Sequence, residues 1–97
     1  MITAIVTFPL AKGTSSADAK ALFEASASNY KNFPGLIRKY YLYGDGPLGG
    51  GVYLWESRAA ADKLYTTEWR KTLEERLGAA PKILFFESPV IVDNDQH

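Results

Sequence analysis

Two runs of aromatic and β-branched residues, 36–43 and 52–56, flank a stretch that contains five glycines and Pro47. This pattern predicts an antiparallel hairpin whose glycines, at positions 44, 46 and 49–51, form the turn. If Tyr41 lies opposite Tyr53, strand alternation divides the side chains between two faces. The first face then carries Lys39, Tyr41, Tyr43, Tyr53 and Trp55, and the second carries Arg38, Tyr40, Leu42, Val52, Leu54 and Glu56. Both faces hold large apolar side chains, so each face needs cover.

The size and charge of the chain limit the classes of protein to which it can belong. Its 97 residues are enough for one domain, residues 1–97, in which 93–97 form a polar tail. The formal net charge is zero and no basic patch is present, so we expect no nucleic-acid partner. The chain contains no cysteine, which excludes disulfides and cysteine-bound metals. Met1 leads into a short strand pattern and not into a signal peptide or membrane span, so we expect a cytoplasmic protein without a membrane partner.

The remaining elements follow from periodicity and capping residues. Residues 2–8 alternate as a half-buried strand, and Ser15 with Asp18 resembles a capping box that begins a helix ending near 32–35. Ser57 can cap a helix over 58–65, with a further helical segment over 68–77. Residues 82–92 predict a long strand, broken or bulged at Pro89, which suits an edge or an exchange position better than a central one. The order β-α-β-β-α-β predicts a ferredoxin-like α+β fold, an antiparallel sheet with both helices on one face.

A sheet covered by helices on one face leaves its other apolar face open. A second copy of the same sheet is the simplest cover, which would produce a dimeric α+β barrel with a two-fold symmetric interface. We therefore predict a homodimer in which the strand around Pro89 reaches towards the partner.

Three segments carry a resemblance to a known family. They are Phe33-Pro-Gly-Leu-Ile-Arg-Lys-Tyr-Tyr-Leu, Gly49-Gly-Gly-Val-Tyr-Leu-Trp-Glu-Ser-Arg-Ala-Ala-Ala, and the stretch from Glu68-Trp-Arg to Gly78-Ala-Ala-Pro81. Through them the chain resembles the antibiotic-biosynthesis-monooxygenase-like dimeric α+β barrels, and most closely the small bacterial YdhR-type proteins. The resemblance implies oxygenation of an aromatic or polycyclic hydroxylated small molecule with dioxygen, without a cofactor, in a pocket between sheet and helices.

The hairpin supplies the candidate catalytic residues Arg38, Tyr41 and Tyr53. Arg38 could hold an oxyanion with two donors, or it could form a cross-strand ion pair with Glu56. The tyrosine hydroxyls could donate to substrate oxygens, while Tyr43 and Trp55 could stack on an aromatic substrate. The same aromatic side chains could instead fill a dimer interface.

The helices supply a second set of candidates. Tyr65 and Trp69 lie on an apolar helical stripe, where they could line the substrate pocket or belong to the core. Asn29 and Tyr30 could reach the same pocket. His97, the single histidine, lies in the polar tail, so we assign it no catalytic role and expect neither haem ligation nor a metal site.

Two other functions use the same fold. One is a non-catalytic ligand-binding or stress-related module with the same pocket, and the other is an isomerase or lyase. Binding without oxygen uptake would indicate the first, and turnover under anaerobic conditions would indicate the second.

Overall fold

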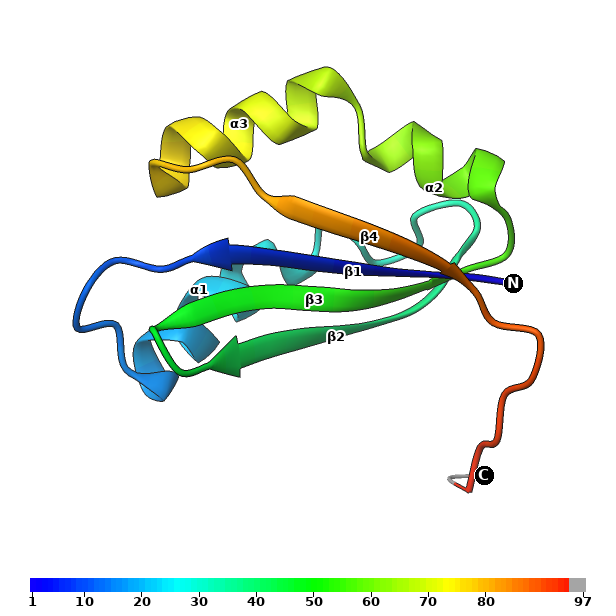
Figure 1. Cartoon of the computed structure of the whole chain (residues 1–97), viewed down its shortest axis with the longest axis horizontal. Coiled ribbons are helices and arrows are strands. Elements are labelled where there is room, and N and C mark those ends of the chain that lie inside the picture. The colour runs from blue at the N-terminus through cyan, green and yellow to red at the C-terminus, as the bar shows by residue number, and fades with distance from the viewer. Residues whose placement is uncertain (95–97) are drawn as a thin grey trace.

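The protein forms an antiparallel sheet with its helices packed on one face (Figure 1). The structure is a computed structural model and describes residues 1–94. His97 lies outside the described residues. The elements are β1 (Ile2–Pro9), α1 (Ser16–Ala27), β2 (Leu36–Gly44), β3 (Leu48–Trp55), α2 (Arg58–Leu64), α3 (Thr67–Leu77) and β4 (Lys82–Glu87). The strand order is β2-β3-β1-β4, and every neighbouring pair is antiparallel. The predicted ferredoxin-like α+β fold is confirmed.

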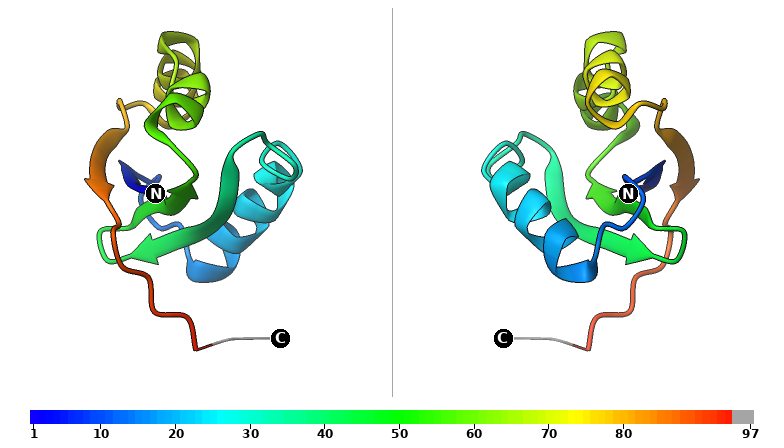
Figure 2. Two further views of the ribbon diagram at one scale, coloured as in Figure 1. Left: turned by 90° about the vertical axis from the view of Figure 1, so that its right-hand side faces the viewer. Right: turned by 90° about the vertical axis from the view of Figure 1, so that its left-hand side faces the viewer.

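The helices form two separate groups over the sheet. Helix α1 packs beside β2, whereas α2 contacts β1 and β3, and Figure 2 shows α1 set apart from α2 and α3. Side chains of α1, of α3 and of the sheet line the same cavity, so both groups of helices lie over one face. This arrangement leaves room for a cavity between α1 and α3.

The predicted division of the hairpin into two faces is correct, but its register is shifted by two residues. Lys39 lies opposite Tyr53, and Tyr41 lies opposite Gly51. A shift by an even number of residues keeps each side chain on its face. Arg38 lies opposite Leu54, so the expected cross-strand pairing with Glu56 is wrong.

The register is shifted because residues 49–51 belong to β3 and not, as had been predicted, to the turn. The turn itself is formed by residues 45–47. All three glycines are buried and pair with both β1 and β2. A β-carbon at Gly49 would lie 2.9 Å from Phe8 Cε1, and one at Gly50 would collide with the carbonyl oxygen of Val6. These strand glycines therefore permit close approach of neighbouring groups.

Local capping explains where the helices begin and end. The predicted capping box of α1 is present, because Ser15 Oγ accepts from the amide of Asp18 and the Asp18 carboxylate accepts from the amide of Ser15, each at 3.1 Å. Helix α1 ends at Ala27, earlier than the expected 32–35. Thr66 caps α3 and separates it from α2, close to the predicted interruption.

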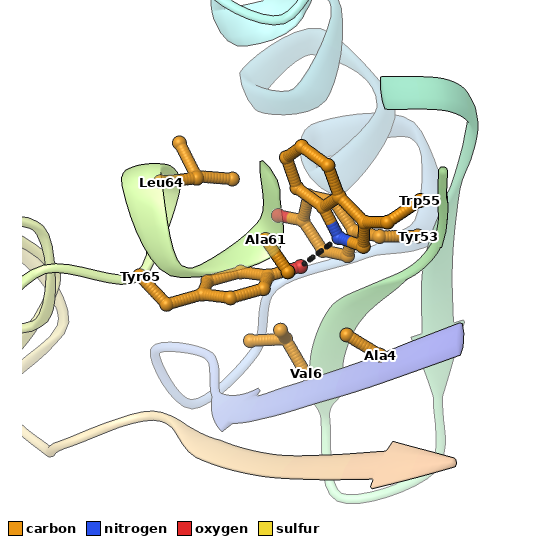
Figure 3. Close-up of a cluster of buried hydrophobic side chains, with 7 residues drawn as sticks. All are labelled: Ala4, Val6, Tyr53, Trp55, Ala61, Leu64 and Tyr65. Carbon is orange, nitrogen blue, oxygen red and sulfur yellow. Dashed lines mark hydrogen bonds between the residues drawn. The ribbon is translucent and has the colours of Figure 1, made fainter. Parts of the chain in front are cut away.

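The core lies between α2 and the centre of the sheet. Trp55 is 0% exposed, and its indole N–H donates to the hydroxyl of Tyr65 at 3.1 Å, with Ala4 and Val6 of β1 close by (Figure 3). An aromatic side chain buries roughly 150–250 Å², so at about 25 cal/mol per Å² the burial of Trp55 stabilises the fold by several kcal/mol. The hydrogen bond satisfies the buried indole donor without exposing it to water.

The opposite face of the sheet carries large apolar side chains that remain open in the described chain. Tyr40 is 55% exposed, Leu84 50% and Phe86 49%. The expected strand over 82–92 is shorter, since β4 ends at Glu87, just before Pro89. Its edge position is as predicted.

Candidate functional site

A cavity of about 330 Å³ lies between α1, α3 and the sheet. It is lined by Phe8, Phe23, Ser26, Asn29, Tyr30, Lys39, Tyr41, Gly50, Tyr53, Leu64, Trp69, Thr72, Leu73 and Arg76. Its volume falls in the range of roughly 300–1,000 Å³ that is typical of small-molecule sites. Asn29, Thr72 and Arg76 are exposed residues among the lining, so they mark the side on which the cavity meets solvent.

The amine of Lys39 lies among three tyrosine rings inside this cavity. Its Nζ is 3.4 Å from the ring centre of Tyr30, 3.9 Å from that of Tyr41 and 4.5 Å from that of Tyr53. The negative faces of aromatic rings attract a cation at such distances. The rings therefore hold the lysine side chain in one place and offer favourable contacts when it is protonated.

Burial lowers the pKa of Lys39 to about 7, because the charged ammonium loses its hydration. A carboxylate beside the amine would act in the opposite direction, but none of the lining residues in the described chain is Asp or Glu. Arg76, at the mouth of the cavity, is cationic, so it disfavours a second positive charge on the Lys39 amine. The structure thus places an amine that titrates near neutral pH inside an aromatic cavity.

The phenol groups of Tyr41 and Tyr53 stay protonated over the same pH range. Burial raises the pKa of Tyr41 and raises that of Tyr53 well above its usual range. The Ser26 hydroxyl donates to the carbonyl of Phe23 at 3.0 Å, so the Tyr41 hydroxyl is the donor in its 2.8 Å bond to Ser26. Both tyrosines are therefore neutral groups, and neither can accept a proton as a phenolate near pH 7.

Stacked and edge-to-face rings build the walls of the cavity. Phe23 of α1 stacks on Tyr41 with ring centres 4.8 Å apart. From α3, the indole N–H of Trp69 points to the Tyr30 hydroxyl at 3.5 Å, a long hydrogen bond. An aromatic ligand in this space would meet ring faces on several sides.

A second, more apolar space of about 320 Å³ adjoins the cavity. The two share Phe8, Phe23, Leu73 and Arg76, and the second is also lined by Leu10, Ala11, Thr14, Leu22 and Leu77. Together they suit a ligand with one polar end near Lys39 and one apolar end.

The structure brings only part of the predicted site together. Tyr41, Tyr53 and Trp69 line the cavity, as do Asn29 and Tyr30. Their catalytic and substrate-binding roles stay predictions.

Four other predicted site residues lie elsewhere. Trp55 and Tyr65 are buried in the core, where they bond each other. Tyr43 lies outside the cavity, and its hydroxyl donates to the carbonyl of Thr14 at 2.8 Å.

Arg38 is the fourth of these residues, and it lies on the opposite face of the sheet. Its guanidinium donates to the hydroxyl of Tyr40 at 3.2 Å and forms an ion pair with Asp93 at 3.4 Å. An alternating strand places Arg38 and its neighbour Lys39 on different faces, so Arg38 cannot serve the cavity from this position.

Lys39 was not among the predicted site residues, although the predicted hairpin places it on the aromatic face. A lysine between tyrosines on an inward strand face is itself a usable signal, because such a side chain must be buried, paired or functional. Ser26 and Phe23 gave no comparable signal, since small polar and aromatic residues are ordinary on a helix.

Residues 1–94 contain neither a group of metal-binding side chains nor a helix suited to span a membrane. Across residues 1–94, no cluster of three or more His, Asp or Glu side chains is arranged to hold a metal ion. Likewise, none of the helices in the described chain is both long and apolar enough to cross a membrane.

Comparisons with known proteins identify the fold. No protein-family model matches the chain, and no curated protein matches it either. Among solved structures, a monooxygenase from the gene ActVA-Orf6 of Streptomyces coelicolor, in complex with nanaomycin D, is 24% identical. The match covers 96% of this chain and 92% of that chain, with a TM-score of 0.66.

Two further solved structures are similar. SnoaB, a cofactor-independent oxygenase from Streptomyces nogalater, is 16% identical over 94% of this chain and 95% of its own, with a TM-score of 0.66. A mutant of MhuD with two manganese protoporphyrin IX molecules per active site is 20% identical over 97% of this chain and 100% of its own, with a TM-score of 0.67. At these identities the likeness establishes a shared fold. The expected barrel family is thus supported at the level of fold, and the YdhR-type subgroup stays a prediction.

Proposed function

We propose that this protein is a homodimeric, cofactor-independent monooxygenase that acts on an aromatic or polycyclic hydroxylated small molecule. The observation that carries the proposal is the aromatic-lined cavity of about 330 Å³ between α1, α3 and the sheet. Two proteins with the same fold are a monooxygenase and a cofactor-independent oxygenase, which supports the choice of reaction. The complex of the first with nanaomycin D supports a polycyclic ligand.

The reaction needs a substrate whose anion can reduce dioxygen directly. In an anthrone-type substrate, a methylene between aromatic rings is oxidised to a carbonyl. One oxygen atom enters the product, the other leaves as water, and the substrate supplies all the electrons. The protein has to favour the anion, exclude water and stabilise reduced oxygen beside it. Ring walls and neutral phenol donors such as Tyr53 suit these tasks.

The homodimer is supported by the open apolar face of the sheet. Tyr40, Leu84 and Phe86 are each about half exposed there, and Val52 and Leu54 line a groove on the same face. Monomeric proteins rarely expose a large apolar patch to water. A second copy presents the same surface and can cover it symmetrically.

Oxygen uptake tests the proposed reaction. Purified protein, treated with chelator, is mixed with an anthrone, and dioxygen consumption and quinone formation are measured together. A Thr72→Trp variant should block the cavity and lower the rate at least about tenfold, because a bulky side chain would replace a small lining residue. Lys71→Trp, at an exposed neighbouring position outside the lining, is the control and should keep the wild-type rate.

The outcomes separate oxygenation from simple binding. Uptake that is equal with and without protein, across anthrones and quinols, would rule out the oxygenase. Saturable binding of the same compounds without uptake, lost in Thr72→Trp and kept in Lys71→Trp, would instead support a ligand-binding module.

A further inference from the structure

Lys39 is the partly buried amine of the cavity, and its Nζ lies among the rings of Tyr30, Tyr41 and Tyr53. We propose that Lys39 accepts the proton of an acidic hydroxyl on the aromatic substrate, and that the ammonium group so formed holds the substrate anion in the cavity. This inference rests on the proposed function, because it supplies the anion which that reaction consumes.

The position of Lys39 is fixed from several sides. Three tyrosine rings surround its Nζ, from the segment after α1, from β2 and from β3. The side chain also crosses Gly51, where an added β-carbon would lie 3.1 Å from Lys39 Cε. Catalytic proton acceptors need such a fixed position, because proton transfer requires hydrogen-bond distance in the bound complex.

The charges around Lys39 leave a place for an anion. The groups that face it are the phenols of Tyr30, Tyr41 and Tyr53, with Arg76 of α3 at the mouth. On the outer side of β2, Lys31 and Arg38 share a shallow pocket with it. These groups are neutral or cationic, and neither lined space contains Asp or Glu among its described residues. A protonated Lys39 therefore has ring faces as partners but no counter-ion from the lining.

A substrate anion would complete this arrangement. Opposite charges within about 4–6 Å favour the charged form of both groups, and the effect is stronger where water is excluded. An aromatic hydroxyl beside Lys39 would become more acidic, and the amine would become more basic. Ionisation and tight binding thus follow from the same contact.

The transfer itself is a balanced proton step. The substrate O–H bond breaks, an N–H bond forms on Lys39 Nζ, and no electron moves between the two groups. The pair keeps its total charge, now divided into an ammonium and an oxyanion. In the proposed oxygenase, the electron-rich anion then reduces dioxygen, and the proton held by Lys39 is available to the oxygen atom that leaves as water.

The other polar groups of the cavity cannot replace Lys39 in this step. Tyr41 and Tyr53 have raised pKa values and remain protonated, so they lack a basic site of sufficient strength. Arg76 carries a guanidinium group, which has donors and no acceptor for a proton. Asn29, Ser26 and Thr72 are neutral and too weakly basic to hold a proton.

A phenol whose colour changes on ionisation tests the proposal directly. Para-nitrophenol ionises near neutral pH, and its phenolate absorbs visible light. We expect wild-type protein to lower the apparent pKa of the bound probe by at least about one pH unit. Lys39→Met replaces the lysine stem with an unbranched chain of four heavy atoms and removes the amine, and it should bind the probe without this change. Lys71→Met, at an exposed position outside both lined spaces, is the matched control and should behave as wild type.

A titration of the unmodified protein covers the case in which Lys39→Met does not fold. The lysine Cε resonances are followed by NMR against pH, with Lys39 assigned by its loss in Lys39→Arg. A midpoint near neutral pH that rises when para-nitrophenol is added supports the proposal. A midpoint that does not respond to the probe overturns it, as does an unchanged shift of the probe in folded Lys39→Met.

Oxygen uptake distinguishes this inference from the proposed function. Probe ionisation that depends on Lys39, in a protein that consumes no dioxygen with any anthrone or quinol, would refute the oxygenase and support the proton acceptor. Uptake at the wild-type rate in Lys39→Met would overturn the role of Lys39 and leave the oxygenase in place.

Discussion

The side chain of Lys39 lies across the bare backbone of Gly51, so that a β-carbon on the glycine would be 3.1 Å from Lys39 Cε. The two residues belong to neighbouring strands, β2 and β3. A side chain at position 51 would therefore occupy space that the Lys39 side chain now fills. Because Gly51 on β3 has no side chain, the Lys39 side chain on β2 can lie across it.

Gly51→Ala should destabilise the protein and displace Lys39. The added methyl would also lie 3.1 Å from the Tyr40 carbonyl oxygen and 3.2 Å from Tyr53 Cε1. Overpacking of this kind costs about 1–3 kcal/mol of unfolding free energy, measurable by urea denaturation. Gly44→Ala is the control, because its β-carbon would meet nothing closer than the Leu48 carbonyl oxygen at 4.0 Å. Equal stabilities of the two variants would contradict the close approach.

Stability should rise as the pH increases from about 7 towards 10, because of Lys39. Its pKa is about 7 in the folded protein and 10.5 as a free side chain, so in this window the unfolded chain binds more protons. The slope contributed by one such group is at most about 1.4 kcal/mol per pH unit. Urea denaturation at several pH values measures it.

Lys39→Met should remove this rise, because methionine has no titrating group, and Lys20→Met at an exposed position should keep it. Above pH 10 the buried tyrosines reverse the trend, since their raised pKa values make the unfolded chain lose protons first. A flat profile in the wild type between pH 7 and 10 would show that Lys39 is well hydrated.

Tyr65→Phe should destabilise the core without weakening ligand binding. The variant leaves the buried indole N–H of Trp55 without the acceptor that it has at 3.1 Å, which costs about 1–3 kcal/mol. Because Tyr65 is not among the residues lining the cavity, the affinity for para-nitrophenol should be unchanged. If the variant binds the probe more weakly at unchanged stability, Tyr65 contacts the ligand and is not only a core residue.

Phe86→Asp should convert the proposed dimer to a monomer. A carboxylate at this half-exposed position would be buried without a partner in a sheet-to-sheet interface, which strongly opposes association. Sedimentation velocity measures the change, with Leu22→Asp on the exposed side of α1 as the control. Sedimentation of the wild-type protein as a monomer at micromolar concentration would rule out the dimer.

The fold and the candidate site differed in how far they could be predicted. Element order, helix caps and the two faces of the hairpin follow from local patterns, and Ser15 with Asp18 formed its predicted capping box. The cavity depended on where α1 and α3 meet the sheet. Tyr53 and Trp55 share a face and a strand, yet Tyr53 lines the cavity while α2 covers Trp55. Nothing in the alternation of a strand distinguishes two such positions.

By itself, the sequence determined the face on which each strand residue lies, because side chains alternate with a period of two residues whatever the register. Only the tertiary structure decided that residues 49–51 extend β3, and therefore that Lys39 faces Tyr53 and passes over Gly51. The physical reason is that glycine suits both a turn and a crowded strand, and only the approach of Val6 and Phe8 from β1 selects the strand. The same packing removes part of the Lys39 side chain from water, and that burial lowers its pKa.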